Sequence, residues 1–269
     1  MDERVVKSVD TLSQMGAAVR TEHEKVTYLF LADRELSALD LAILEPLHDL
    51  TTLRLMNCRV DDRIFSYLKD MPNLSDLSLW GTRITDDGLC HLSNLKLKSL
   101  DVRCTQVGDA GLAHLREMTT LEQLELLFTK VANVGIGHLS GLGNLKKLSL
   151  VCTEVGDEGI RHLCGLSELE DLELEDTRVT AKGLEYIANL SKLRALTLHR
   201  TEINDDSLAY LSGLKRLRIL YLCDTPITDA GLKHLEKVSS LEVVYINGTE
   251  ITDVGVQEFK MVLPNCDIS

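Results

Sequence analysis

The residues best suited to chemistry are Glu175, His199 and Cys223, which follow one another at intervals of 24 residues. A cysteine beside a histidine beside a carboxylate is the order of a nucleophile, its general base and the group that orients the base. Such a site must exclude water and offer donors to an oxyanion. The open sheet that the repeats predict excludes little water, and no nest of backbone donors is evident. We therefore predict no catalytic residue, and keep an enzyme or metal-dependent site here as the alternative function.

The residue that follows each member of this series favours a structural interpretation. Asp176, Arg200 and Asp224 alternate in charge at the same spacing of 24 residues. Opposite charges on neighbouring strands attract each other across a sheet. The sequence thus predicts cross-strand ion pairs in this region.

Histidine and cysteine also recur without predicting a metal or cofactor site. Five histidines share one position of a repeated phrase: His91, His114, His138, His162 and His234. Metal ligands converge to about 2.1 Å from one ion, whereas this column follows the outer side of a curved solenoid, where the coils fan apart. None of the seven cysteines forms a CxxC pair, which argues against a zinc knuckle or a redox dithiol. We expect free thiols, no metal and no cofactor.

Composition limits the class of partner. The chain has 42 acidic and 29 basic residues, and its formal charge is −13. This charge repels nucleic-acid phosphate and anionic lipid, and it favours a basic partner. The first residues carry no apolar run of signal-peptide length, and no stretch approaches the ~20 apolar residues that span a bilayer. We expect a cytoplasmic monomer that binds neither nucleic acid nor membrane.

All of these residues belong to a unit that repeats through the chain. NLSDLSLWGTRITDDGLCHL (73–92) aligns without gaps to RLRILYLCDTPITDAGLKHL (216–235), and the copies recur every 24 residues except for one interval of 23. The alternation in LSDLSL predicts a strand, and the spacing of three in TDDGLCHLSNL predicts a short helix. One unit of this length cannot bury its own leucines, so about ten coils must stack.

Two further positions predict how the coils join. Aspartates stand where a helix N-cap acceptor would lie: Asp86, Asp109, Asp157, Asp205, Asp229 and Asp253. Such a carboxylate can accept a hydrogen bond from the first turn of its helix. Gly88 and its counterparts come two residues later, and we expect them to allow tight packing between coils.

The L-x-x-L-x-L phrase, which extends over residues 26–250, resembles the leucine-rich repeat family. Its continuation T-x-I-T-D-x-G-L is similar to a subtype of bacterial repeat proteins and of the cysteine-containing repeats of F-box proteins. Threonine replaces the usual Asn or Cys after the strand, Cys58 alone keeps the cysteine, and no F-box precedes the repeats. The resemblance implies a right-handed α/β horseshoe solenoid, with a parallel sheet on its concave face and short helices on its convex face. It also implies a role in protein binding.

We expect a single structural domain with a cap at each end. Residues 1–25 form an N-terminal helical cap, 26–256 the repeats and 257–269 the C-terminal cap. The first cap presents one apolar helical face: Val5, Val9, Leu12 and Met15. The last coil is covered by Phe259, Val262 and Leu263. With both caps, we expect the chain to be complete.

The outward side chains of the strands carry the functional prediction, because the fold does not choose them. Six of the eleven aromatic residues map to this face: Tyr28, Phe30, Trp80, Phe128, Tyr221 and Tyr245. Aromatic residues are favoured at the centres of interfaces. The predicted partner-binding residues are Trp80, Arg103, Leu127, Phe128, Val151, Glu173, Glu175, His199, Tyr221 and Tyr245.

These residues predict two apolar patches with a group of acidic residues between them. Trp80, Leu127, Phe128 and Val151 form the first patch, flanked by Arg103; the second comprises Ile219, Tyr221, Val243 and Tyr245. The acidic residues are Glu125, Asp171, Glu173, Glu175 and Asp176. We predict non-catalytic recognition of a protein or peptide with basic and apolar residues. A binder of a small molecule or glycan through Trp80 and Phe128 is a further alternative.

Overall fold

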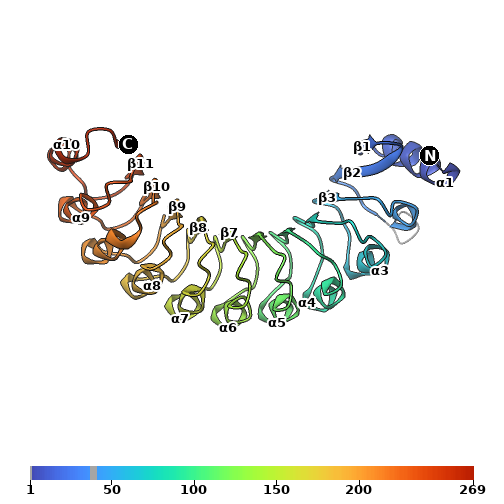
Figure 1. Ribbon diagram of the computed structural model, residues 1–269, viewed down its shortest axis with the longest axis horizontal. Coiled ribbons are helices and arrows are strands. Elements are labelled where there is room, and N and C mark those ends of the chain that lie inside the picture. The colour runs from blue at the N-terminus through green and yellow to red at the C-terminus, as the bar shows by residue number, and fades with distance from the viewer. Residues whose placement is uncertain (1, 37–40) are drawn as a thin grey trace. The chain divides into compact units, whose positions relative to one another are not determined.

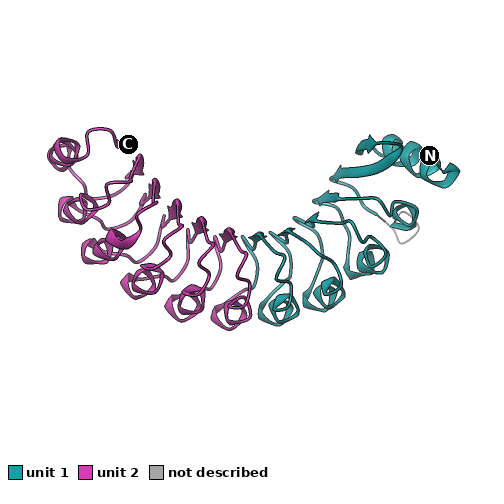
Figure 2. Cartoon of the chain, viewed as in Figure 1, with its two compact units in different colours: residues 1–130 teal, residues 131–269 magenta. Residues whose placement is uncertain are grey.

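The computed structural model describes residues 2–36 and 41–269 (Figure 1). The chain divides into two compact units, residues 1–130 and residues 131–269 (Figure 2). In each unit, coils stack so that the strands line one side and the short helices line the other. The predicted α/β leucine-rich-repeat solenoid is confirmed.

The first unit begins with helix α1 (Glu3–Gln14) and a hairpin of β1 (Ala18–Glu22) and β2 (Lys25–Ala32). The strands that follow are parallel and in register: β3 (Thr52–Met56), β4 (Asp76–Ser78), β5 (Ser99–Asp101) and β6 (Gln123–Glu125). Between them lie η1 (Ala42–Leu44), η2 (Asp62–Ile64), α3 (Phe65–Leu68), α4 (Asp86–Leu89), η3 (Cys90–Leu92), α5 (Asp109–Leu112) and η4 (Ala113–Leu115).

The second unit repeats this pattern. Its parallel strands are β7 (Lys147–Ser149), β8 (Asp171–Glu173), β9 (Ala195–Thr197), β10 (Ile219–Tyr221), β11 (Val243–Tyr245) and β12 (Asp267–Ile268). Its helical segments are α6 (Asn133–Gly137), α7 (Asp157–Ile160), η5 (Arg161–Leu163), α8 (Ala181–Ile187), η6 (Asp205–Gly213), α9 (Asp229–Leu235) and α10 (Asp253–Val262).

The core of each unit is a stack of aliphatic side chains. Register places the middle residue of each strand beside its equivalent in the next coil, as with Leu172, Leu196 and Leu220. All three are fully buried. Burying one such side chain contributes about 2 kcal/mol, and only stacked neighbours provide the cover.

The threonines that replace the usual Asn or Cys make one recurrent hydrogen bond. Each threonine hydroxyl donates to the carbonyl three residues earlier, as Thr177 Oγ1 does to Leu174 at 2.6 Å. The same bond recurs at 2.5–2.7 Å in coils of both units. Most of these threonines are buried, so the bond satisfies a carbonyl that water cannot reach.

The aspartate column links coils and does not cap its own helix. Gly156, and not Asp157, is the N-cap of α7. Asp157 accepts the backbone N–H of Thr180, in the next coil, at 2.9 Å and its hydroxyl at 2.7 Å. The N-cap prediction for the aspartates was therefore wrong, because the residue before each of them already has the extended backbone of an N-cap.

The glycine column makes room for this link, as predicted. A Cβ added at Gly183 would lie 2.7 Å from Asp157 Oδ1, and one at Gly231 would lie 2.6 Å from Asp205 Oδ1. Asp205 accepts from Thr228 in the same way. Coils thus approach closely because one position has no side chain.

The N-terminal cap is more than a helix. It also contains β1, which pairs antiparallel with β2, the strand of the first coil. The apolar face of α1 buries Leu12 fully, together with Ser8, while Val5, Val9 and Met15 are half-buried. The hairpin turns through His23 and Glu24, both with positive φ (50° and 64°).

The C-terminal end also differs from the prediction. Phe259 is fully buried and Leu263 is half-buried, but Val262 is 51% exposed and contributes little to the cover. Instead β12 pairs with β11, and its Ile268 is buried at the end of the sheet. None of the described helices has the length and apolar character to cross a membrane.

Candidate protein-binding surface

One column of residues just beyond the strands has left-handed backbone in every repeat coil. The φ angles are +50° to +75°, and the residues are Asn57, Gly81, Cys104, Phe128, Cys152, Asp176, Arg200, Asp224 and Gly248. Glycine, asparagine and aspartate tolerate this conformation, whereas other residues pay about 1–3 kcal/mol. Phe128 is 59% exposed, so packing does not offset that cost. The fold alone does not explain this phenylalanine.

Trp80 stands on the strand face of the first unit, held by an arginine. The guanidinium of Arg103 lies 4.9 Å from the centre of the Trp80 ring, a cation–π contact. Arg103 also donates from Nε and Nη2 to the two oxygens of Asp101, each at 2.9 Å. These bonds raise the pKa of Arg103 above its ordinary value. Arg103, itself fixed by Asp101, therefore holds the indole in place.

Asp101 is the centre of this cluster, and the sequence prediction missed it. Asp101 is 8% exposed, and its carboxylate accepts also from the Ser78 hydroxyl at 2.8 Å and the Arg103 backbone N–H at 3.1 Å. Four hydrogen bonds offset the cost of burying the charge. The signal available in the sequence was an aspartate at an outward strand position, two residues before an arginine.

A cavity of about 260 Å³ opens beside this cluster. It is lined by outward side chains from β2 to β6, including Phe30, Met56, Trp80, Asp101, Arg103 and Glu125. A second ion pair, Arg54 to Asp76 at 3.0 Å, also lines it. The strand face of the first unit thus combines rings, a thioether and fixed charges around one hollow.

The remaining members of the first predicted patch are less prominent. Leu127 is half-buried, in the coil after Arg103. Trp80, Arg103 and Leu127 occupy equivalent positions of three successive coils, so Arg103 lies between the other two. Val151 belongs to the second unit and is only 8% exposed, so it offers little surface to a partner.

The strand face of the second unit carries a row of rings. Tyr221 and Tyr245 stack with their centres 4.5 Å apart and their planes 10° from parallel. His199 tilts against Tyr221 at 5.2 Å. Burial, and then the neighbouring Tyr245, raise the pKa of Tyr221. Ile219 and Val243 are half-buried beside the tyrosines, and together these residues form a continuous, partly apolar strip.

Charges of the second unit pair across coils as predicted. Arg200 Nη2 lies 2.5 Å from Glu175 Oε1, Arg200 Nε is 3.5 Å from Asp176, and Arg200 Nη1 is 3.9 Å from Asp224. Lys147 lies 3.2 Å from Glu173. The acidic residues on the strand face of this unit are therefore partly neutralised by its own arginine and lysine side chains.

The series Glu175, His199 and Cys223 lacks the hydrogen bonds that a catalytic triad needs. Glu175 binds Arg200, and among the described residues no hydrogen bond joins Glu175 to His199 or His199 to Cys223. Burial, and then Asp176, raise the pKa of the nearby Cys152 thiol, which opposes thiolate formation. All seven cysteines are free, and the described residues contain no cluster of three metal-ligating side chains.

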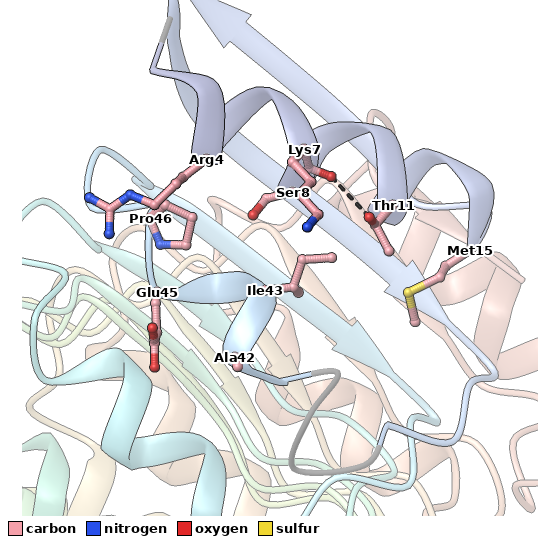
Figure 3. Close-up of a pocket in the computed structure, with 9 residues that line it drawn as sticks. All are labelled: Arg4, Lys7, Ser8, Thr11, Met15, Ala42, Ile43, Glu45 and Pro46. Carbon is pink, nitrogen blue, oxygen red and sulfur yellow. Dashed lines mark hydrogen bonds between the residues drawn. The ribbon is translucent and has the colours of Figure 1, made fainter.

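A partly apolar hollow outside the strand face lies in the N-terminal cap (Figure 3). A cavity of about 350 Å³ separates α1 from the segment around η1, and Ile43 and Met15 contribute apolar walls. Thr11 donates its hydroxyl to the Lys7 carbonyl at 2.9 Å. No sequence signal singled out this place, and none of the predicted binding residues lines it.

Comparison with known proteins agrees with this architecture. A family model described as Leucine Rich repeat matches residues 93–115 and 144–164. No curated protein gives a significant match.

Solved structures share the fold at low sequence identity. Internalin C2 of Listeria monocytogenes is 24% identical, with 91% of this chain and 93% of that chain covered and a TM-score of 0.63. The L. monocytogenes internalin InlF is 18% identical, with 99% and 94% covered and a TM-score of 0.65. A leucine-rich repeat protein of Leptospira interrogans is 19% identical, with 87% and 57% covered and a TM-score of 0.65.

Proposed function

We propose that this leucine-rich repeat protein binds another protein or peptide through the outward side chains of its strands, without catalysing a reaction. The proposal depends most on Phe128. An exposed aromatic ring occupies a left-handed position that glycine, asparagine or aspartate fills in five other coils. A residue that costs backbone strain and gains little burial is best explained by contact with a partner.

Trp80 supplies a second anchor in the same unit. Rings at interface centres contribute strongly when they are held in place beforehand, because less side-chain entropy is lost on binding. Arg103 and Asp101 provide that hold. The cavity beside Trp80 offers room for an apolar side chain of the partner.

The second unit suits a partner with basic and apolar residues. Tyr221 and Tyr245 offer ring surface, and Glu173 lies on the same side of the sheet two strands away. A lysine or arginine of the partner can contact an aromatic ring while a carboxylate neutralises its charge. Lys147 competes for Glu173, so this contribution is sensitive to salt.

We place the protein in the cytoplasm and regard it as a non-enzyme. Seven free thiols and no disulfide suit a reducing compartment. Because Glu175 is committed to Arg200, the series with His199 and Cys223 lacks the group that would orient a base.

The test is affinity capture with matched variants. Trp80→Ala and Phe128→Ala should each weaken binding of the captured partner by roughly thirtyfold, the loss of a hot spot of about 2 kcal/mol. Tyr210→Ala is the control, because this ring is 39% exposed on η6, away from the strands. Thermal unfolding checks that each variant is folded. Retention of full affinity by both strand-face variants would refute the proposal.

A further inference from the structure

A second surface of residues 131–269 lies where the chain passes from each helix to the next strand. Basic and acidic side chains pair there between neighbouring coils. Lys192 Nζ is 2.6 Å from Glu168, Arg194 is 3.4 Å from Glu170, and Arg218 is 3.4 Å from Glu242. Each pair joins residues 24 positions apart, so the pairing follows the stacking of the coils.

Arg216 breaks this rule. Its equivalents in the adjacent coils are Lys192, a second cation, and Ser240, where a carboxylate would complete a pair. Within the described ranges 2–36 and 41–269, Arg216 is exposed and has no hydrogen bond or ion pair. Lys215 beside it reaches only a backbone oxygen, that of Ser212, at 2.6 Å. Two neighbouring positive charges therefore lack a carboxylate partner.

Both cations open onto one cavity of about 470 Å³. Arg194 and Arg218 line it as well, and Ser239, Ser240 and Asn265 add polar groups. The one carboxylate of the lining is Glu242, which is paired with Arg218. The Ser240 hydroxyl donates its proton to the Leu217 carbonyl at 2.7 Å. It can therefore accept a further hydrogen bond but cannot donate one.

We infer that this cavity binds a phosphate dianion, either inorganic phosphate or a phosphate monoester. The two cations without carboxylate partners match its charge of about −1.5 to −2 at neutral pH. Guanidinium groups suit phosphate because their parallel N–H donors fit two oxygens at once. A monocarboxylate would balance only one of the two charges. The inference is independent of the strand-face proposal, because the two surfaces share no residue.

The test is a titration of the ¹⁵N-labelled protein with inorganic phosphate in a buffer without other oxyanions. Amide signals of Arg216, Ser239 and Ser240 should shift and saturate. Sodium acetate at equal ionic strength should give no saturable shift. Arg216→Ala and Lys215→Ala should each raise the phosphate Kd by about tenfold, the effect of losing one charge-assisted hydrogen bond.

The matched control is Arg178→Ala, which removes an exposed arginine of the same unit that is paired with Glu154. It changes the net charge equally and should leave the phosphate Kd unchanged. Equal binding by wild type, Arg216→Ala and Lys215→Ala would overturn the inference. So would acetate binding as tight as phosphate binding, or loss of phosphate binding in Arg178→Ala. Unshifted amides elsewhere in each variant establish that it is folded.

Discussion

The columns of the turns and the columns of the strand face obey opposite rules. In the turns the same residue types recur, as Thr177 and Thr201 or Asp157 and Asp205 do. The threonines make the same bond within their coils, and the aspartates make the same bond to the next coil. On the strand face the residues differ from coil to coil, as Trp80 and Arg103 do. Repetition marks what every coil needs to stack. Variation marks positions that stability leaves open to binding.

Phe128 departs from the pattern of its column. It lies in the left-handed column, where the backbone favours glycine, asparagine and aspartate, and yet its side chain is large and exposed. The proposed function assigns this ring to a contact with the partner. The predictions below separate the two kinds of column, from the largest expected effect to the smallest.

The largest effect is expected in the turns. Asp157→Ala removes the acceptor of two hydrogen bonds from Thr180 and leaves a partly buried N–H unsatisfied. We expect the free energy of unfolding to fall by about 1–3 kcal/mol, measured by urea denaturation. Glu158→Ala is the control, since its ion pair with Arg161 is exposed; it should cost less than about 0.5 kcal/mol. Equal losses would show that the aspartate column does not join the coils.

Phe128→Asn should act in opposite directions on stability and binding. Asparagine tolerates the left-handed backbone, and little buried area is lost because the ring is 59% exposed. We expect the free energy of unfolding to rise by about 0.5–1 kcal/mol, while partner binding weakens by roughly thirtyfold, as expected for Phe128→Ala. A destabilised variant would indicate that the ring packs within the fold after all.

The next largest effect is a loss of binding affinity, and it is expected at Asp101 on the strand face. Asp101→Asn keeps the shape of the side chain but weakens the hold on Arg103 and so on Trp80. Affinity for the protein partner should fall by about tenfold, or roughly 1.4 kcal/mol. Trp80 fluorescence should report a more mobile ring. Unchanged affinity together with a mobile ring would mean that ordering of Trp80 is irrelevant to recognition.

The smallest effect concerns pH. Hydrogen bonds from the Thr252 backbone, and then from its hydroxyl, lower the pKa of Asp229 below its ordinary 3.8. A carboxyl whose pKa is lower in the folded state stabilises above its unfolded pKa, and this contribution is lost as pH falls through the folded value. Thr252→Val should move the Asp229 pKa back toward 3.8 in an NMR titration. A pKa that does not move would exclude the hydroxyl as a cause.

Much of the fold follows from the period of the sequence, because leucines at fixed intervals allow only stacked coils. The N-terminal hairpin does not follow, since its turn uses His23 and Glu24 in place of the Asn-Gly or Asp-Gly pair that signals such a turn. The final strand β12 has only two residues, too few for a periodic signal. The aspartates were misassigned because a link to another coil and a cap leave the same local pattern.

The candidate site was predictable only as a set of outward positions. Alternation along the strand places Trp80 and Tyr221 on the correct face, and both are half-buried there. It does not reveal that Arg103 covers Trp80 or that Asp101 anchors Arg103, because these contacts depend on side-chain conformation. Nor does it reveal that neighbours bury Val151. Alternation along a strand predicts which way a side chain points, whereas its exposed fraction depends on the size of the adjacent side chains.

The most direct test is site-specific photocrosslinking in cells. A benzophenone amino acid replaces Phe128 in one variant and, in the control, Val134, which is 70% exposed on the helical side of the second unit. We predict a discrete protein adduct from position 128 that is absent from position 134 and is reduced by Trp80→Ala. Adducts of equal yield and identity from both positions, or from position 134 alone, would contradict recognition through the strand face.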